Sequence, residues 1–137
     1  MLTLDHVAIA VPDLAEAIER WSHDLGLALA GTEDVPTSQT STAFFPVTDA
    51  TRHARIELVA PLDGEGPIAG HLERRGAGLH HLCFRTDDIL EAVERLRARG
   101  YRFITDSPQP GAHGTKVIFL HPKSTGGVLI ELAEHPA

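Results

Sequence analysis

The chain has 137 residues, of which 42% are apolar, and this suits a single domain with a modest core. Its net charge is −7 and its basic residues are scattered, which argues against a nucleic-acid partner. No apolar run is long enough to cross a bilayer, so we expect no membrane partner. The first residues lack the pattern of a signal segment, and the single cysteine excludes an internal disulfide. We therefore expect a cytoplasmic protein.

The first half of the chain predicts a strand, a helix and three more strands. A short apolar run over 4–11 indicates the first strand. Asp13 and Glu16 have the spacing of a capping box, which predicts the start of a helix, and Gly26 lies where that helix should end. Turn-forming residues then separate three candidate strands, near 27–32, 41–47 and 54–60.

A linker and a second run of the same elements follow. Glycines and a proline over 64–67 break the chain before a short predicted helix over 68–75. The next strand is expected over 79–85, and Asp88 with Glu91 repeats the capping-box spacing at the start of the next helix. Three further strands are expected near 101–105, 115–120 and 127–133.

The two halves of the chain are copies of one βαβββ module. The segment 4–20 aligns without gaps on 79–95, so that each residue is 75 positions from its equivalent. The ends of the halves also match, because an Ile-Glu-Leu triplet surrounds both Glu57 and Glu131. The predicted organisation is therefore one α+β domain, 1–137, with repeated modules 1–62 and 77–134.

Four polar side chains are expected on the sheet faces that the helices leave open. Side chains alternate across a strand, so His6 lies opposite the branched residues that pack on the helix. The same count places Glu57, His81 and Glu131 off the helix-packed faces, beside small residues that leave room for a ligand. Alone, each would most often be a structural residue, but their repetition at equivalent places favours a shared role.

Two imidazoles and two carboxylates form a mixed nitrogen and oxygen site. Such a donor set suits one divalent ion, with Co, Mn, Ni, Zn and Fe(II) all acceptable. Four protein ligands on a six-coordinate ion leave two positions for a bidentate oxygen substrate. The sequence therefore predicts a metal site formed by His6, Glu57, His81 and Glu131.

Essentially the whole chain resembles a known family. The resemblance is carried by four stretches, LDHVAIAV, RIELVAPL, GAGLHHLCFRTDDI and FLHPKSTGGVLIEL. The chain resembles the vicinal oxygen chelate superfamily, in which paired βαβββ modules form a metal-containing cleft, and within it the methylmalonyl-CoA epimerases. The resemblance implies interconversion of (2R)- and (2S)-methylmalonyl-CoA through an enolate that a divalent ion stabilises. It also implies a homodimer and the same ligands, His6, Glu57, His81 and Glu131, although some epimerases are expected to have glutamine at the place of Glu57.

Epimerisation needs an acid/base group for each face of the α-carbon. We predict Glu131 as one catalytic group and Glu57 as its partner, since the internal repeat relates them. Some epimerases have a further glutamate on the third strand as a proposed base, but the matching stretch, 40–45, has no carboxylate. His80 is a poor ligand candidate because alternation turns it to the face opposite His81.

The HPKSTGG turn is the candidate contact for the CoA moiety. Lys123 offers a point charge and Ser124 a hydroxyl to a phosphate group, although the turn glycines equally suit a plain hairpin. His113 either lines the entrance or is an exposed loop histidine.

Three other functions fit the same module. A glyoxalase-I-type isomerase of glutathione thiohemiacetals would use the same four ligands. An extradiol dioxygenase is less favoured, because its Fe(II) site needs two histidines and only one carboxylate. A metal-free antibiotic-binding protein would need no complete ligand set.

Overall fold

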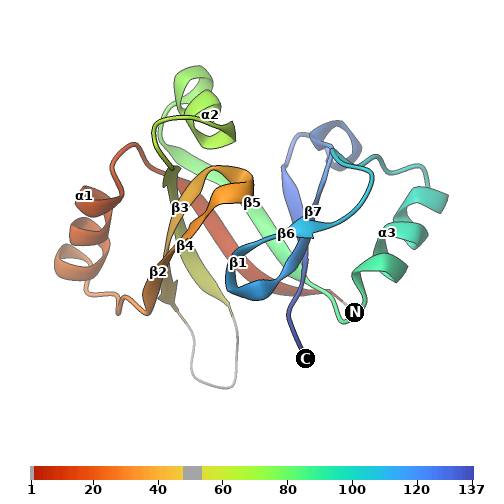
Figure 1. Cartoon of the computed structure of the whole chain (residues 1–137), viewed down its shortest axis with the longest axis horizontal. Helices are drawn as coiled ribbons and strands as arrows, with labels where there is room; N and C mark the ends of the chain where they lie inside the picture. Colours follow the sequence, from red (N-terminus) through yellow and green to blue (C-terminus); the bar gives the residue numbers. More distant parts are fainter. Residues whose placement is uncertain (1, 48–53) are drawn as a thin grey trace. The chain divides into compact units, whose positions relative to one another are not determined.

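The computed structural model describes residues 2–47 and 54–137, which form two compact units (Figure 1). The N-terminal unit is His6–His80, and the C-terminal unit combines Met1–Asp5 with His81–Ala137. Each unit holds four strands of mixed direction with a helix packed on them, which confirms the α+β class. Within the described residues, no helix is long and apolar enough to cross a membrane.

The same order of elements occurs twice. The first set consists of β1 (Thr3–Ala10), α1 (Leu14–Ile18), β2 (Gly31–Val35), β3 (Thr40–Pro46) and β4 (Arg55–Pro61), and is followed by the linker helix α2 (Pro67–Arg75). The second set consists of β5 (Gly78–Arg85), α3 (Ile89–Ala98), β6 (Gln109–Pro110), β7 (Lys116–Leu120) and β8 (Ile130–Glu134). The strand orders are β2-β3-β4-β1 and β5-β8-β7-β6, with β1 parallel to β4, β5 parallel to β8 and the other pairs antiparallel.

Both predicted helix starts are confirmed. Asp13 Oδ1 accepts a hydrogen bond from the backbone N–H of Glu16 at 3.1 Å, and Asp88 Oδ1 accepts one from Glu91 at 3.1 Å. These bonds satisfy donors that the first helical turn leaves without an intrahelical partner. After α1 the chain continues as a π-helical segment, Glu19–Asp24, before it turns away from the helix.

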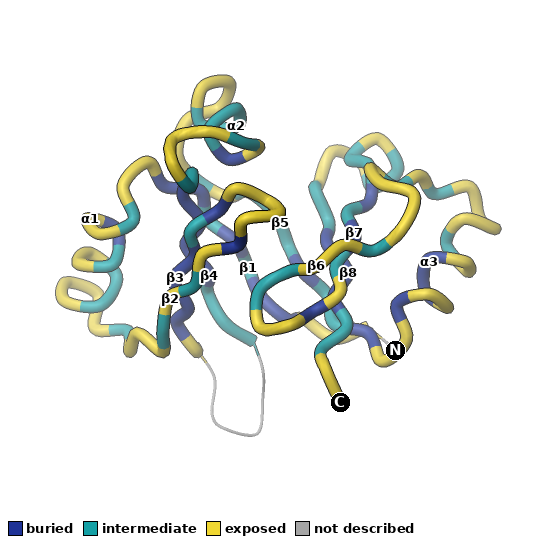
Figure 2. The backbone as a smooth tube through the Cα atoms, viewed as in Figure 1, coloured by how far each residue is buried: buried dark blue, intermediate teal, exposed yellow. Residues whose placement is uncertain are grey.

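Each helix covers one face of its strands, as the alternation of side chains predicts. In the N-terminal unit, Phe45 and Leu58 of the strands, together with Val11 just after β1, pack with α1 in one buried cluster. In the C-terminal unit, Ile118 and Leu132 pack with α3 in the equivalent cluster. Figure 2 shows this burial along the strands and on the strand-facing sides of the helices.

Two predicted strands lie elsewhere. The strand expected at 27–32 is found at 31–35. Among the described strands, β2 is a polar edge strand paired with β3, and Leu27, which precedes it, packs in the core beside α1. The strand expected at 101–105 is wrong, because only an isolated bridge joins Phe103 to Leu120. Both predictions relied on the apolar content of the sequence, whereas pairing with a neighbouring strand decides where an edge strand forms.

Candidate metal and acid/base residues

The N-terminal unit brings His6 and Glu57 together. Strands β1 and β4 are parallel with Ala8 opposite Glu57, so His6 and Glu57 project from the same face. His6 Nδ1 lies 3.1 Å from Glu57 Oε2, and the two side chains are only 8% and 6% exposed. A buried histidine and a buried glutamate are therefore paired on the face opposite α1.

The C-terminal unit holds the equivalent pair. Cys83 of β5 lies opposite Glu131 of β8, and this matches the position of Ala8 opposite Glu57. His81 Nε2 is 3.1 Å from Glu131 Oε1, with side-chain exposures of 8% and 10%. The repeat in the sequence thus corresponds to two pairs of the same kind with the same strand register.

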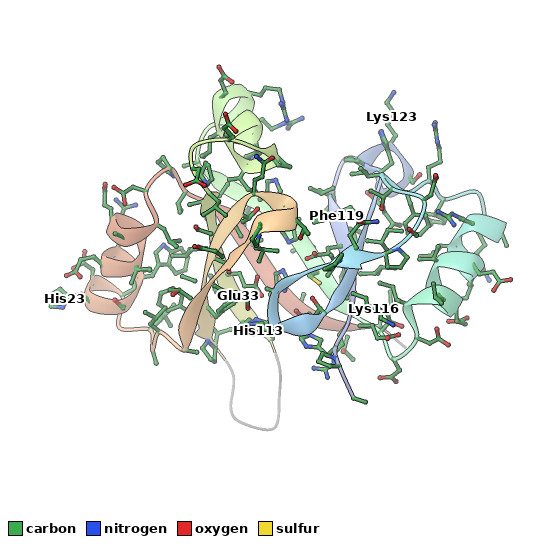
Figure 3. All side chains as sticks on the ribbon, viewed as in Figure 1. His23, Glu33, His113, Lys116, Phe119 and Lys123 are labelled. Carbon is green, nitrogen blue, oxygen red and sulfur yellow. The ribbon has the colours of Figure 1, made fainter. Side chains whose placement is uncertain are left out.

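Two phenylalanines stand opposite the two glutamates and were missed in the sequence. Phe44 of β3 pairs with Glu57, and Phe119 of β7 pairs with Glu131. The Phe119 ring, labelled in Figure 3, packs edge-on against the His81 ring at 5.2 Å between centroids. The signal that could have found them is their spacing of 75 residues, which is the offset of the repeat.

Arg55 makes the two pairs unequal. Its Nε and Nη2 donate to Glu57 Oε2 at 2.8 and 2.7 Å, and its guanidinium lies 5.7 Å from the centre of the Phe44 ring. The equivalent position two residues before Glu131 is Leu129, which offers no donor. The sequence reasoning missed Arg55, although alternation along β4 places it on the same face as Glu57.

The C-terminal pair has the spacing of two metal ligands, and His6 offers a further imidazole. Ligand atoms at neighbouring positions around an ion with bonds near 2.1 Å lie about 3 Å apart, and His81 Nε2 lies 3.1 Å from Glu131 Oε1. In the other pair, it is the Nδ1 atom of His6 that lies 3.1 Å from Glu57 Oε2. When His6 Nδ1 carries the proton shared with Glu57, its Nε2 presents a lone pair suited to a metal. Ligation through Glu57 Oε2 would compete with Arg55.

The room predicted beside the small residues of β1 is occupied. Ala8 and Ala10 are fully buried and form a cluster with Val59 and with Ile68 and Leu72 of α2. The linker helix therefore covers part of the face that carries His6. Beside Ala8 and Ala10, two of the small residues expected to leave room for a ligand, the space is filled, because the apolar stripe of α2 must be buried.

Lys123 and Ser124 lie in a short 3₁₀ turn, Pro122–Thr125, of the C-terminal unit. Ser124 Oγ accepts the backbone N–H of Arg102 at 3.0 Å, so the hydroxyl already anchors that segment. Figure 3 shows the Lys123 side chain extending away from the ribbon. Contact of this turn with a CoA phosphate stays a prediction.

His80 packs against the linker helix. Its ring meets the His71 ring edge-on, at 4.7 Å between centroids. Burial and the positive charges of Arg75 and Arg74 lower the pKa of His71 below its ordinary value. His71 is therefore held toward its neutral form.

A further buried pair joins the two ends of the chain within the C-terminal unit. His135 Nε2 lies 2.6 Å from Asp5 Oδ1, and the Asp5 side chain is 1% exposed. No local pattern connects these residues, since they are 130 positions apart. Asp5 is the neighbour of His6 in sequence and projects from the other side of β1.

Comparison with known proteins agrees with this geometry. The family model of the Glyoxalase/Bleomycin resistance protein/Dioxygenase superfamily matches residues 5–119. The chain is 41% identical over 133 residues to the ethylmalonyl-CoA/methylmalonyl-CoA epimerase of Cereibacter sphaeroides, with 96% of each chain covered.

Solved structures give the same result. Methylmalonyl-CoA epimerase from Mycobacterium tuberculosis superposes with a TM-score of 0.90 at 39% identity, covering 98% of this chain and 88% of that one. A variant of the Streptomyces coelicolor enzyme in complex with 2-nitronate-propionyl-CoA superposes with a TM-score of 0.93 at 30% identity, covering 100% of both chains. The chain therefore belongs to the methylmalonyl-CoA epimerase family of the Glyoxalase/Bleomycin resistance protein/Dioxygenase superfamily.

Proposed function

We propose that this protein is an isomerase that interconverts (2R)- and (2S)-methylmalonyl-CoA. The observation that carries the proposal is the pair of buried His–Glu contacts, one in each repeated module, in a chain that matches epimerases over nearly its whole length. A structural role for one such pair would be ordinary, but two equivalent pairs support a shared chemical role.

We assign His6, Glu57, His81 and Glu131 as ligands of one divalent ion. Neutral imidazole and ionised carboxylate are the forms that bind a metal, and this donor set suits Co, Mn, Ni, Zn or Fe(II). When bound, the ion supplies Lewis-acid stabilisation of the negative charge that develops on the substrate oxygens. The 3.1 Å between His81 Nε2 and Glu131 Oε1 supports the assignment, and the contact of His6 Nδ1 with Glu57 leaves His6 Nε2 for the metal.

Glu131 is assigned as one group that moves the α-proton. Its carboxylate contacts the His81 ring, lies on a strand position opposite Phe119 and is mostly buried. Glu57 is related to it by the repeat, and its role as the second acid/base stays a prediction. The contacts that Arg55 and His6 make with Glu57 Oε2 favour a fixed carboxylate there.

The acyl-CoA substrate requires a binding site for its phosphates. We propose that Lys123 and Ser124 contact a phosphate group, with the ammonium supplying the charge and the hydroxyl a hydrogen bond. A homodimer and a cytoplasmic location complete the proposal. Sedimentation of the purified protein and fractionation of its source cells test these two points.

The experiment is a chiral assay of methylmalonyl-CoA with metal-replete protein, before and after treatment with a chelator. We expect epimerisation that the chelator abolishes and that one of the five metals restores. Absence of epimerisation in the metal-replete protein would refute the function. A glutathione hemithioacetal tested in parallel should not react, and turnover of that compound alone would indicate a glyoxalase-type isomerase.

Elemental analysis separates the enzyme from a binding protein of the same fold. We expect close to one divalent ion per chain and a higher melting temperature on adding Co²⁺ or Mn²⁺. A chain that holds no metal and shows no change in melting temperature would favour the metal-free binder.

A further inference from the structure

Epimerisation needs a second carboxylate besides Glu131 as an acid/base group. β3 offers none, since its residues 40–46 include no Asp or Glu. Glu57 is constrained, because Arg55 Nε, Arg55 Nη2 and His6 Nδ1 all lie within 3.1 Å of its Oε2. A proton transfer through this oxygen would have to break several contacts.

The strand register brings another carboxylate to the same face. Glu33 of β2 lies directly opposite Thr42 of β3, and Phe44, two residues further along β3, lies directly opposite Glu57 of β4. Residues directly opposite each other, and residues two apart on one strand, project from the same face. Glu33 therefore shares a face with Glu57, and Figure 3 shows it on the side of the strands away from α1.

Thr42 fixes the strand at this point. Its buried Oγ1 donates to the backbone carbonyl of Glu33 at 2.8 Å. The adjacent acid, Asp34, projects from the other face, where its Oδ1 accepts a hydrogen bond from Ser41 Oγ at 2.7 Å. Two neighbouring carboxylates on one strand are thus sorted to opposite faces, and only Glu33 lies with the His6–Glu57 pair.

We propose that Glu33 is the second acid/base group, a proposal that rests on the epimerase function above. Glu33 is two strands from β4, roughly 10 Å across the sheet. A base must reach the proton on the carbon between the substrate oxygens, and Glu57 is held by Arg55 and His6, whereas Glu33 lies outside this His–Glu pair. Glu33 is a partly exposed carboxylate on the same face as that pair, which makes it the candidate for this role.

The proton balance closes with two glutamates. One ionised carboxylate forms an O–H bond to the α-proton while the C–H bond breaks and its electron pair enters the enolate. The other glutamate, protonated at the start, gives its proton to the opposite face of the α-carbon, and the electron pair of the enolate forms the new C–H bond. Glu131 serves one epimer as base and Glu33 serves the other, and the exchanged protonation states reset through solvent.

The test incubates each epimer separately in D₂O with the metal-replete Glu33→Gln variant. We expect epimerisation to fall by about 100-fold or more, the usual contribution of a general acid/base. The α-proton of one epimer should still exchange for deuterium through Glu131, whereas the other epimer should not exchange above the enzyme-free rate. The retained exchange also shows that the variant is folded and binds substrate.

Asp34→Asn is the matched control, because it neutralises the adjacent acid on the other face and should keep epimerisation within about 3-fold. Epimerisation by Glu33→Gln at the rate of the unmodified chain would overturn the proposal, as would equal loss of exchange for both epimers. One-sided exchange in Glu57→Gln with normal behaviour of Glu33→Gln would assign the role to Glu57. If the unmodified chain does not epimerise, the proposed function itself fails, so the two failures are distinguishable.

Discussion

Arg55 gives one of two repeated His–Glu pairs a different chemical character. A carboxylate that is largely removed from water needs hydrogen bonds or an opposite charge to stay ionised. Glu57 has the Arg55 fork in addition to His6, whereas Glu131 has Leu129 at the position equivalent to Arg55. We therefore read the N-terminal pair as the more rigid one and the C-terminal pair as the one that moves a proton.

Replacing Arg55 tests this difference at the level of single residues. Arg55→Gln should lower the free energy of unfolding by about 2 kcal/mol, because Glu57 stays buried with fewer donors. In a Glu57→Gln background the same change should cost about 1 kcal/mol less, since no charge is left to neutralise. Denaturant unfolding of the four proteins of this double-mutant cycle measures the coupling, and equal costs in both backgrounds would contradict it.

At the scale of elements, the repeat extends to the way each helix begins. Asp13 and Asp88 occupy equivalent N-cap positions and accept hydrogen bonds of the same length. The helices bring the branched residues of each unit into one core and leave the other face to the polar pairs. The linker helix α2 adds a partial cover on that other face in the N-terminal unit.

Removing an N-cap side chain should destabilise the helix by about the free energy of one hydrogen bond to the backbone. Asp88→Ala should lower the free energy of unfolding by about 1 kcal/mol. Asp87→Ala removes the same charge one residue earlier without removing the cap and should cost clearly less. Thermal unfolding of both variants makes the comparison, and equal losses would show that charge rather than capping matters.

The linker helix should also contribute a pH dependence through His71. Its pKa is lowered, so the unfolded chain binds this proton more readily than the folded one, and stability decreases as pH falls through 6.5. Above that value the contribution is constant. His71→Gln should flatten the loss between neutral and acidic pH, as seen in denaturant unfolding at several pH values.

The cause of the shift can be checked directly by NMR titration of His71. Because the charge of Arg75 contributes to the lowering, Arg75→Gln should move the His71 pKa toward 6.5. A titration curve that does not change would leave burial and the charge of Arg74 as the causes.

At the scale of the whole molecule, the two ends of the chain lie in the same compact unit and contact each other. Met1–Asp5 belongs to the unit formed by the last part of the chain, and Asp5 meets His135 there. This contact joins the first strand to the segment after the last one. The contact closes a loop that includes nearly the whole sequence. Closing so long a loop costs conformational entropy, and strong local contacts are needed to offset it.

Breaking the Asp5–His135 contact should loosen both ends of the C-terminal unit. Asp5→Asn should cost about 2 kcal/mol of unfolding free energy, since the buried pair loses its charge. Hydrogen exchange should then speed up at the start of β1 and the end of β8. Unchanged protection at β8 would show that the two ends are held independently.

The sequence determined the features that are local or periodic. Alternation along the strands gave the face of His6, Glu57, His81 and Glu131, and the 75-residue offset gave the two modules. Cap spacing located the starts of α1 and α3. These features follow from short stretches of chain whose geometry is set by backbone periods.

Only the tertiary structure decided what depends on strand register. Four features follow from which residues lie opposite each other on paired segments. They are the Arg55 hydrogen bonds to Glu57, the contact of Asp5 with His135, the position of β2 and the face of Glu33. A shift of one residue would turn Glu33 to the opposite face and leave Asp34 in its place. The free energy of strand pairing is spread over whole strands, so no short stretch of the sequence predicts the register.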